Sequence, residues 1–252
     1  MRSPPRILAI AGSDSSGGAG IQADIKTITM LGGYAMTAIT AVTAQNSVGV
    51  RAVEVLAPEI VAAQIDACLT DIGVDAIKIG MLGSPAIAGI VFDRLDGLTI
   101  PIVFDPVMVA TSGSALADEA TVAGFEPLMR LATLTTPNVA ELTALGGPEA
   151  MARRRVAYLA KGGDAQGPEV EDRLSRPAME DRLWRSPRID TRHNHGTGCT
   201  LSSAIATLLG KGLPLDEAIE DARRFVRAAL EAAPGFGAGH GPMGHHAVRL
   251  RP

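Results

Sequence analysis

The chain alternates between short apolar runs and stretches in which apolar residues recur at helical spacing. Continuous apolar or β-branched runs predict strands at residues 7–11, 36–43, 76–81, 100–104 and 133–136. Helical spacing predicts helices at residues 20–31, from Pro58, at 86–95, over most of 116–131, and from near Gly198 and Leu215. A helix is expected to begin at Pro58, and the side chains on its inner face are Val61, Ile65, Cys68, Leu69 and Ile72.

Repeated strand and helix segments predict an α/β domain with a mostly parallel central sheet, helices on both faces and right-handed crossovers. We expect residues 1–252 to form one such domain. Ligands of these sheets bind beyond the carboxyl ends of the strands, and the unusual Gly, Asp, Asn and Cys residues do follow predicted strands. Two segments are less regular: residues 146–158, and the charge-rich residues 169–185, which we interpret as a solvated hairpin or loop.

Composition narrows the class of protein. Of the 252 residues, 46% are hydrophobic and 20% are charged, as in ordinary globular domains. The net charge of −4 argues against nucleic acid as a partner. No apolar stretch is long enough for a membrane span or a secretory core, so no membrane partner is expected. Two cysteines are too few for a disulfide framework, which predicts a cytoplasmic protein.

The first candidate site is the sequence GSDSSGGAGIQAD at residues 12–24, where a strand enters a glycine-rich turn and then a helix. Glycine allows close backbone approach to a ligand, and a helix start favours anionic groups. The segment formally matches a dinucleotide fingerprint, but no acidic residue ends the next strand, which makes a Rossmann oxidoreductase a weak alternative. A plain tight turn remains the other interpretation.

The second candidate site is NHGTGCTLSSAIA at residues 194–206, at the start of a predicted helix. Backbone N–H groups of Gly196, Thr197, Gly198 and Cys199 would form an anion hole. The helix dipole is expected to lower the pKa of the Cys199 thiol, which could then act as a base toward a substrate hydroxyl. The alternative is that Cys199 is only a small buried residue.

The third candidate site lies at residues 136–141. Asn138 and Glu141 have the spacing of a capping box. The functional alternative is an amide and a carboxylate that hold hydrated Mg²⁺ beside phosphates. The five histidines show no zinc spacing.

Several motifs occur together in one order: AIAGSDSSGGAGIQADIKT, ITAVTAQNSVGV, IKIGML, VFDPVM, TPNVAEL, KGG and HGTGCTLSSAIA. In this order and spacing, from about Ile7 to Arg227, the chain resembles the hydroxymethylpyrimidine/phosphomethylpyrimidine kinases of the ribokinase-like superfamily. The resemblance implies a homodimer and two successive ATP-dependent phosphorylations in thiamin biosynthesis, first of the hydroxymethylpyrimidine and then of its monophosphate.

The resemblance also implies roles for single residues. It places the pyrimidine against Gln45, Asp24, Gly12, Met81 and Val107. It makes Cys199 the base and residues 196–199 the anion hole. It turns Asp105, Asn138 and Glu141 toward Mg²⁺ and the ATP phosphates, with Asp105 and Glu141 as metal ligands, and assigns Lys161 to the nucleotide side. Gln45 suits this role chemically, because its amide offers a donor and an acceptor to an aminopyrimidine edge.

The sequence departs from the family pattern before Lys161, where it is shorter by about fifteen residues, roughly four helical turns. Residues 155–160 are expected to be the remnant of a strand. Asn194 and Gly244 also replace a usual threonine and asparagine. ATP binding is therefore predicted to be the weaker function. A pyridoxine kinase and a pyrimidine-binding protein with an impaired nucleotide site are the two alternatives.

Overall fold

The computed structural model describes residues 3–111 and 113–248. Strand β1 (Arg6–Asp14) lies inside the sheet, and its side chains alternate between two cores. Leu8 and Ile10 pack into the core on one face of the sheet, and Ile7 and Ala9 into the core on the other. Because successive residues of a strand point to opposite faces, one apolar run can hold helices on both sides.

Among the described residues, nine strands form one sheet in the order β3-β2-β1-β4-β5-β6-β7-β8-β9. Strands β1, β2, β4, β5, β6 and β7 run parallel, whereas β3, β8 and β9 are antiparallel to their neighbours. The remaining strands are β2 (Tyr34–Gln45), β3 (Val50–Val55), β4 (Ala76–Ile79), β5 (Ile102–Phe104), β6 (Leu134–Thr135), β7 (Tyr158–Ala160), β8 (Glu169–Ser175) and β9 (Arg182–Pro187). The predicted mostly parallel sheet is confirmed.

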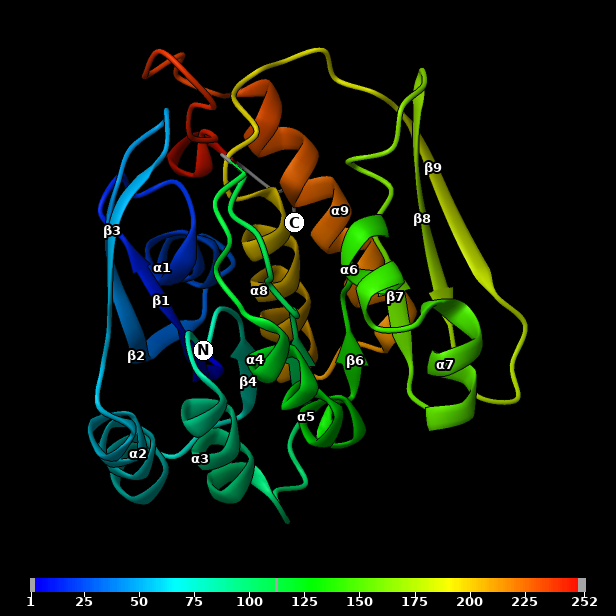
Figure 1. Cartoon of the computed structure of the whole chain (residues 1–252). Helices are drawn as coiled ribbons and strands as arrows, with labels where there is room; N and C mark the ends of the chain where they lie inside the picture. The colour runs from blue at the N-terminus through cyan, green and yellow to red at the C-terminus, as the bar shows by residue number, and fades with distance from the viewer. Residues whose placement is uncertain (1–2, 112, 249–252) are drawn as a thin grey trace.

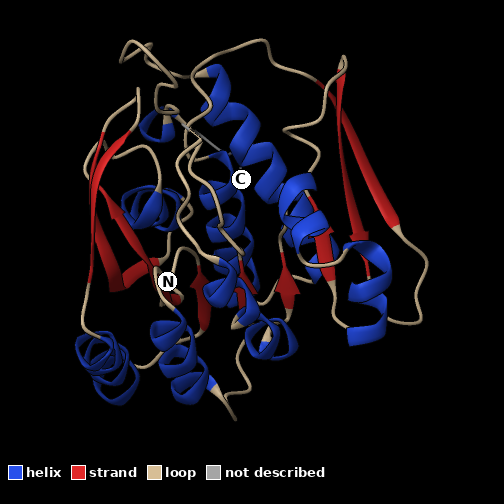
Figure 2. Ribbon diagram, in the orientation of Figure 1, coloured by secondary structure: helices blue, strands red, loops and turns tan. Residues whose placement is uncertain are grey.

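Helices cover both faces of this sheet (Figures 1 and 2). One core contains side chains of α1 (Gly20–Met30), α8 (Thr197–Gly210) and α9 (Leu215–Glu231). The other core contains side chains of the helices that cover the opposite face. The other helices are α2 (Pro58–Ala67), α3 (Pro85–Leu95), α4 (Glu119–Ala123), α5 (Phe125–Leu131), α6 (Val139–Ala144), α7 (Gly147–Arg154), the π-helix Cys68–Ile72 and the 3₁₀-helix His245–Ala247.

Some local predictions differ from the structure. The antiparallel edge strand β3 was not predicted, because its side chains are mostly exposed and leave no buried run. The helix expected over most of residues 116–131 begins only at Glu119 and is divided by Gly124. Ile72 is 39% exposed rather than on an inner face, because the helix widens into a π-turn from Cys68.

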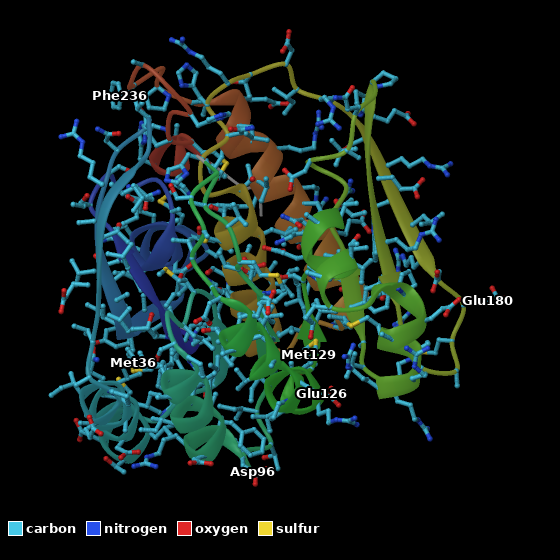
Figure 3. All side chains as sticks on the ribbon, viewed as in Figure 1. Met36, Asp96, Glu126, Met129, Glu180 and Phe236 are labelled. Carbon is cyan, nitrogen blue, oxygen red and sulfur yellow. The ribbon has the colours of Figure 1, made fainter. Side chains whose placement is uncertain are left out.

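The two irregular segments have defined structures. Residues 169–185 form most of the β8–β9 hairpin, as one of the two interpretations predicted, and Figure 3 shows Glu180 at its outer turn. The segment before Lys161 contains the short helix α7 and the strand β7, the expected strand remnant. Within the described part of the chain, no helix is long and apolar enough to cross a membrane.

Candidate active site

One cavity of about 680 Å³ lies at the carboxyl ends of the parallel strands, where the sheet rule places a ligand. Its walls come from the segments that follow β1, β2 and β4 to β7, and from the first turn of α8. Of the predicted site residues, those that line it are Gly12, Gln45, Met81, Asp105, Val107, Asn138, Glu141, Lys161, Gly196, Thr197, Gly198 and Cys199.

At one part of the cavity, a side-chain amide lies beside a sulfur-lined wall. Gln45 is the last residue of strand β2, and its backbone N–H donates a hydrogen bond of 2.8 Å to Ser15 Oγ. This bond fixes the backbone of Gln45. Its amide Nε2 lies 3.3 Å from His195 Nε2. Met81 closes tightly over Gly12, where an added Cβ would lie 2.9 Å from the Met81 sulfur. This part of the cavity can therefore offer both an amide and an apolar wall to a flat ring.

Two residues that sequence reasoning missed hold this end of the cavity. His195 is 4% exposed, and its Nε2 lies 2.8 Å from Asp14 Oδ2. Burial works against the charge of Asp14, but bonds from His195, Ser16 and Ala19 keep its pKa at about 2. Asp14 is thus a fixed anion that orients the imidazole next to Gln45. The first glycine-rich motif and the HGTGC motif contain these residues, and only the fold shows that they meet.

Asp24 requires a correction, because it does not line the cavity. The prediction placed it against the pyrimidine, but its carboxylate is fully buried behind the wall. There it contacts Lys78 Nζ at 2.9 and 3.0 Å and accepts a hydrogen bond of 2.6 Å from Ser203. A side chain that faces inward from α1 is held by the core, so it is not available to a substrate ring.

The start of α8, where the anion hole is predicted, depends on the backbone of Gly196. Its φ of +85° is left-handed, and an added Cβ would lie 1.9 Å from the carbonyl oxygen of Gly18. Only glycine fits this contact between the two glycine-rich segments. Helix α8 then begins at Thr197, so its first N–H groups are free of helical partners, and residues 196–199 line the cavity.

The chemistry of Cys199 also requires a correction. Its thiol lines the cavity in the first turn of α8, as predicted. The helix dipole was expected to lower its pKa, but burial raises the pKa to about 11, and the attraction of Lys78 only partly opposes this. The thiol is therefore protonated at neutral pH, because desolvation outweighs the groups that lower its pKa.

A lysine and two carboxylates form the other polar cluster. Lys161 Nζ lies 2.6 Å from Asp105 Oδ1 and 3.8 Å from Glu141 Oε2. Burial alone would lower the pKa of Lys161, but these two anions raise it above its ordinary value. Burial raises the pKa of Glu141, although Lys161 opposes this. An added Cβ on Gly198 would lie 3.1 Å from the Lys161 ammonium, so this cation borders the anion hole.

The capping interpretation of Asn138 and Glu141 is confirmed. Each side chain accepts a backbone N–H of the other residue at 2.8 Å. Among the described residues, no group of three or more His, Cys, Asp or Glu is arranged to hold a metal ion. Asp105 and Glu141 supply two hard oxygen donors, which is the number that Mg²⁺ commonly takes from a protein beside phosphates and water.

The rest of the cavity is walled by the β8–β9 hairpin and by α9, with residues that the sequence analysis did not select. Asp172, which is 6% exposed, accepts hydrogen bonds from Gly162 N at 2.9 Å and from Arg223 Nε at 2.6 Å. Arg188 donates to the carbonyls of Gly163 at 2.7 Å and of Ala165. These contacts fix the KGG segment, and therefore Lys161, against the hairpin.

A mostly parallel sheet covered by helices, with a glycine-built helix start and a lysine at its strand ends, is the arrangement of a small-molecule kinase of the ribokinase-like fold. A family model described as phosphomethylpyrimidine kinase matches residues 14–244. The hydroxymethylpyrimidine/phosphomethylpyrimidine kinase of Rhizobium meliloti is 47% identical over 94% of this chain and 96% of its own length. The chain belongs to the phosphomethylpyrimidine kinase family, as the resemblance of its motifs predicted.

Solved structures agree with this assignment. The pyridoxal kinase of Bacillus subtilis, in an ADP complex, is similar with a TM-score of 0.87 and 32% identity, covering 99% of this chain and 100% of the other. The phosphomethylpyrimidine kinase of Clostridium difficile is similar with a TM-score of 0.76 and 36% identity, covering 90% of this chain and 99% of the other. The chain is therefore a kinase, and hence a transferase, of this fold.

Proposed function

We propose that this protein transfers the γ-phosphoryl group of ATP to the hydroxymethyl group of 4-amino-5-hydroxymethyl-2-methylpyrimidine, and then to the resulting monophosphate, in thiamin biosynthesis. The observation that carries the proposal is that one cavity contains the Gln45 amide, the Cys199 thiol, the α8 anion hole and Lys161. The names of the relatives support the same chemistry.

In this proposal, Gln45 pairs with the amino group and ring nitrogen of the pyrimidine, and Met81 and Val107 pack on its faces. Gly12 allows the ring to approach the backbone, whereas Asp24 acts only from behind the wall. Such pairing favours the correct ring strongly, because a mismatched edge would leave buried polar groups unpaired.

For the transfer step, Cys199 in its thiolate form takes the proton of the substrate hydroxyl. The hydroxyl oxygen forms a bond to the γ-phosphorus, the bond from that phosphorus to the β–γ bridging oxygen breaks, and ADP leaves with that oxygen. The N–H groups of residues 196–199 and the Lys161 ammonium stabilise the charge on the transferring phosphoryl group. Cys199 then returns its proton to solvent.

Mg²⁺ would neutralise phosphate charge when it is bound. Asp105 and Glu141 are the residues that would hold it, directly or through water. Asn138 would act at the same place by fixing Glu141 through the capping box. Lys161 contacts both carboxylates, so it would share them with the ion.

Pyridoxine or pyridoxal kinase activity is the second candidate function, and the similarity to the B. subtilis pyridoxal kinase is the observation that favours it. A hydroxymethylated pyridine has a similar size, but its ring edge differs from that of an aminopyrimidine. The higher identity to the R. meliloti pyrimidine kinase makes this alternative the weaker one.

We also propose a homodimer in the cytoplasm. The ribbon formed by β2 and β3 exposes Val42, Val53 and Val55 by 47%, 40% and 38%, and a second copy of the chain could cover them. Both cysteines are free thiols, which fits a reducing compartment. Light scattering of the wild type and of Val53→Glu would test the dimer, because only the variant should be monomeric.

A product assay with purified protein, ATP and Mg²⁺ tests the proposed function. Hydroxymethylpyrimidine, its monophosphate and pyridoxine are offered in parallel. We expect the first two to be phosphorylated with kcat/KM well above that for pyridoxine. A preference for pyridoxine would favour the second function, and binding of the pyrimidine without any product would favour an impaired nucleotide site.

A further inference from the structure

A fully buried ion pair lies behind the wall of the cavity. Lys78 on β4 and Asp24 on α1 are both 0% exposed, and the Lys78 ammonium contacts both carboxylate oxygens of Asp24, at 3.0 and 2.9 Å. Ser203 Oγ donates to Asp24 Oδ1 at 2.6 Å. Gly80 makes room for the ammonium, because an added Cβ there would lie 2.7 Å from Lys78 Nζ.

Stability alone is a weak reason for such a pair. Moving two charges out of water is costly, and apolar residues of similar volume often replace a buried ion pair without loss of stability. Burial raises the pKa of Asp24 and opposes the charge on Lys78. The close contacts with Lys78 and the Ser203 hydrogen bond oppose this rise in the pKa of Asp24, and the attraction of Asp24 raises the pKa of Lys78.

Helix α8 links the pair to Cys199 through Ser203. Ser203 follows Cys199 by four residues, so the two side chains lie on one face of the helix, one turn apart. Ser203 is bonded directly to Asp24. The charged groups that act on the thiol are therefore Lys78 on β4 and Asp24 on α1, together with Asp105 after β5 and Lys161 after β7. Of the charges that act on Cys199, Lys78 has the largest effect.

We propose that the Lys78–Asp24 pair is an electrostatic positioning device for Cys199, in which Lys78 favours the thiolate and Asp24 limits that effect. The inference rests on the proposed function only where it gives the thiolate a role in phosphoryl transfer. Neither side chain lines the cavity, so the pair acts through Cys199 and not on the substrate. In this arrangement the buried Lys78 opposes the effect of burial on the Cys199 thiol without itself lining the cavity.

The rate at which iodoacetamide alkylates Cys199 tests the pair without any substrate. Cys68→Ser is introduced into every variant, which leaves Cys199 as the only cysteine. Only the thiolate reacts, so the rate below the pKa reports the thiolate fraction. At pH 8 we expect Lys78→Met to slow alkylation by about tenfold or more and Asp24→Asn to accelerate it by about tenfold, which corresponds to about one unit of pKa in each direction.

Controls separate charge from folding and from access to the thiol. Lys78→Arg retains the charge and should keep a rate near that of the parent. Asp75→Asn removes an ion-pair partner that directly precedes the same strand β4, and it should leave the rate unchanged. Lys78→Arg and Lys78→Met both alter the side chain, but only Lys78→Met removes the charge, so their difference reports charge and not access. In Asp24→Asn, whose thiol pKa should be lower, the pH profile should bend at a lower pH than in the parent, whereas a change in access would move only its height.

Opposite shifts of the Cys199 pKa in the two single variants support the proposal. If the pair were merely structural, its loss would change the alkylation rate in the same direction in both variants. Unchanged profiles in folded variants would overturn it. If either single variant fails to fold by circular dichroism, the double variant Asp24→Leu/Lys78→Met replaces it. This double variant should still alkylate more slowly, because the larger effect of Lys78 is lost, and an unchanged rate would again overturn the proposal.

Turnover gives a second and separable readout. Lys78→Met should lower kcat while the KM for the pyrimidine stays the same, because Gln45 is untouched. If alkylation shifts as expected while kcat does not, the pair still controls the thiol, and the assignment of Cys199 as the base is what fails.

Discussion

At the scale of single residues, Cys199 gives the sharpest test of the proposed step. Cys199→Ser keeps the size but replaces a group that ionises with one that does not. We expect turnover to fall by about 10²- to 10⁴-fold, the usual contribution of a general base, with little change in pyrimidine affinity. Single-turnover phosphoryl transfer measures this, and Cys68→Ser, on a partly buried helix face, is the matched control. Equal rates for Cys199→Ser and wild type would reduce Cys199 to a small residue at a helix start.

The raised pKa of Cys199 predicts a particular pH dependence. In the proposed step the active form is the thiolate, and burial raises the pKa of the thiol to about 11. The thiolate fraction therefore rises by about tenfold per pH unit between pH 7 and pH 9. Single-turnover rates of the wild type should rise with pH over this range, whereas those of Cys199→Ser should not follow the same slope. A flat wild-type profile would show that proton transfer to the thiolate does not limit the step.

Gln45 is expected to set the affinity for the pyrimidine. Gln45→Leu keeps the approximate volume but leaves the buried polar edge of the ligand unpaired, which should cost about 1–3 kcal/mol of binding. Titration calorimetry with hydroxymethylpyrimidine measures this, and the ATP affinity of the same variant is the internal control. Unchanged pyrimidine binding would mean that the ring lies elsewhere in the cavity.

The sequence identified residue types and their places after strands, but not the surroundings of single groups. Asp24 stands in the glycine-rich motif, yet its partner Lys78 is 54 positions away and decides that it is buried. His195 is 150 positions from Gln45, so their contact could not be read from local spacing. The pKa of Cys199 was predicted in the wrong direction for the same reason, because desolvation depends on the packed fold.

At the scale of elements, the wall beside Lys161 depends on Asp172, which joins Gly162 to Arg223 of α9. Asp172→Asn removes the charge that pairs Arg223, and a bond to a charged group contributes about 1.5–3 kcal/mol. We expect ATP affinity to fall by about tenfold or more, while the KM for the pyrimidine stays unchanged. Steady-state kinetics with each substrate varied in turn measures the split.

Glu171→Gln provides the matched control for this variant. Glu171 neighbours Asp172 on β8, but it pairs with Arg173 and Arg185 on the exposed side. Its replacement should leave both KM values unchanged. An equal loss of ATP and pyrimidine affinity in Asp172→Asn would indicate general destabilisation instead of a local wall.

Periodicity predicted the elements whose apolar residues are buried, and it failed where the pattern is exposed or interrupted. The strand β3 lies at the sheet edge with little burial, so it carries no pattern of its own. The shortened segment before Lys161 still forms α7 and β7, and the hairpin and α9 supply much of the adjacent wall. Weak ATP binding as a consequence of this shortening stays a prediction.

At the scale of the whole molecule, chain topology explains why the predicted site residues meet, whereas the function itself was predicted from the resemblance of the motifs to a kinase family. Parallel strands bring their carboxyl ends to one edge, so motifs that are far apart in sequence had to meet there. Twelve of the thirteen predicted site residues line the same cavity, and Asp24 is the exception. The sequence could not indicate the C-terminal residues that pack under α8, because that contact depends on how the chain returns after α9.

One of these C-terminal residues makes the stability of the whole molecule depend on pH. His245 is 2% exposed, and its Nε2 lies 2.8 Å from the hydroxyl of Thr200, the residue that follows Cys199. Burial lowers the pKa of His245 to about 4, with further lowering from Lys26 and His246. The folded protein therefore holds this imidazole neutral, so it can accept the Thr200 hydrogen bond.

The unfolded chain binds a proton at His245 near the ordinary pKa of about 6.5, whereas the folded chain does so only near 4. The contribution of neutral His245 is complete above pH 6.5 and is lost as the pH falls toward 4. The free energy of unfolding should therefore decrease by about 2 kcal/mol between pH 7 and pH 5 through this group alone. His245→Gln cannot titrate, yet its amide can still accept a hydrogen bond from Thr200, so its urea midpoint should fall less over the same range.

Parallel pH dependences for His245→Gln and the wild type would show that other groups cause the acid sensitivity. A steeper loss in the wild type, accompanied by inactivation, would connect that sensitivity to the first turn of α8, where Thr200 directly follows the cysteine of the anion hole.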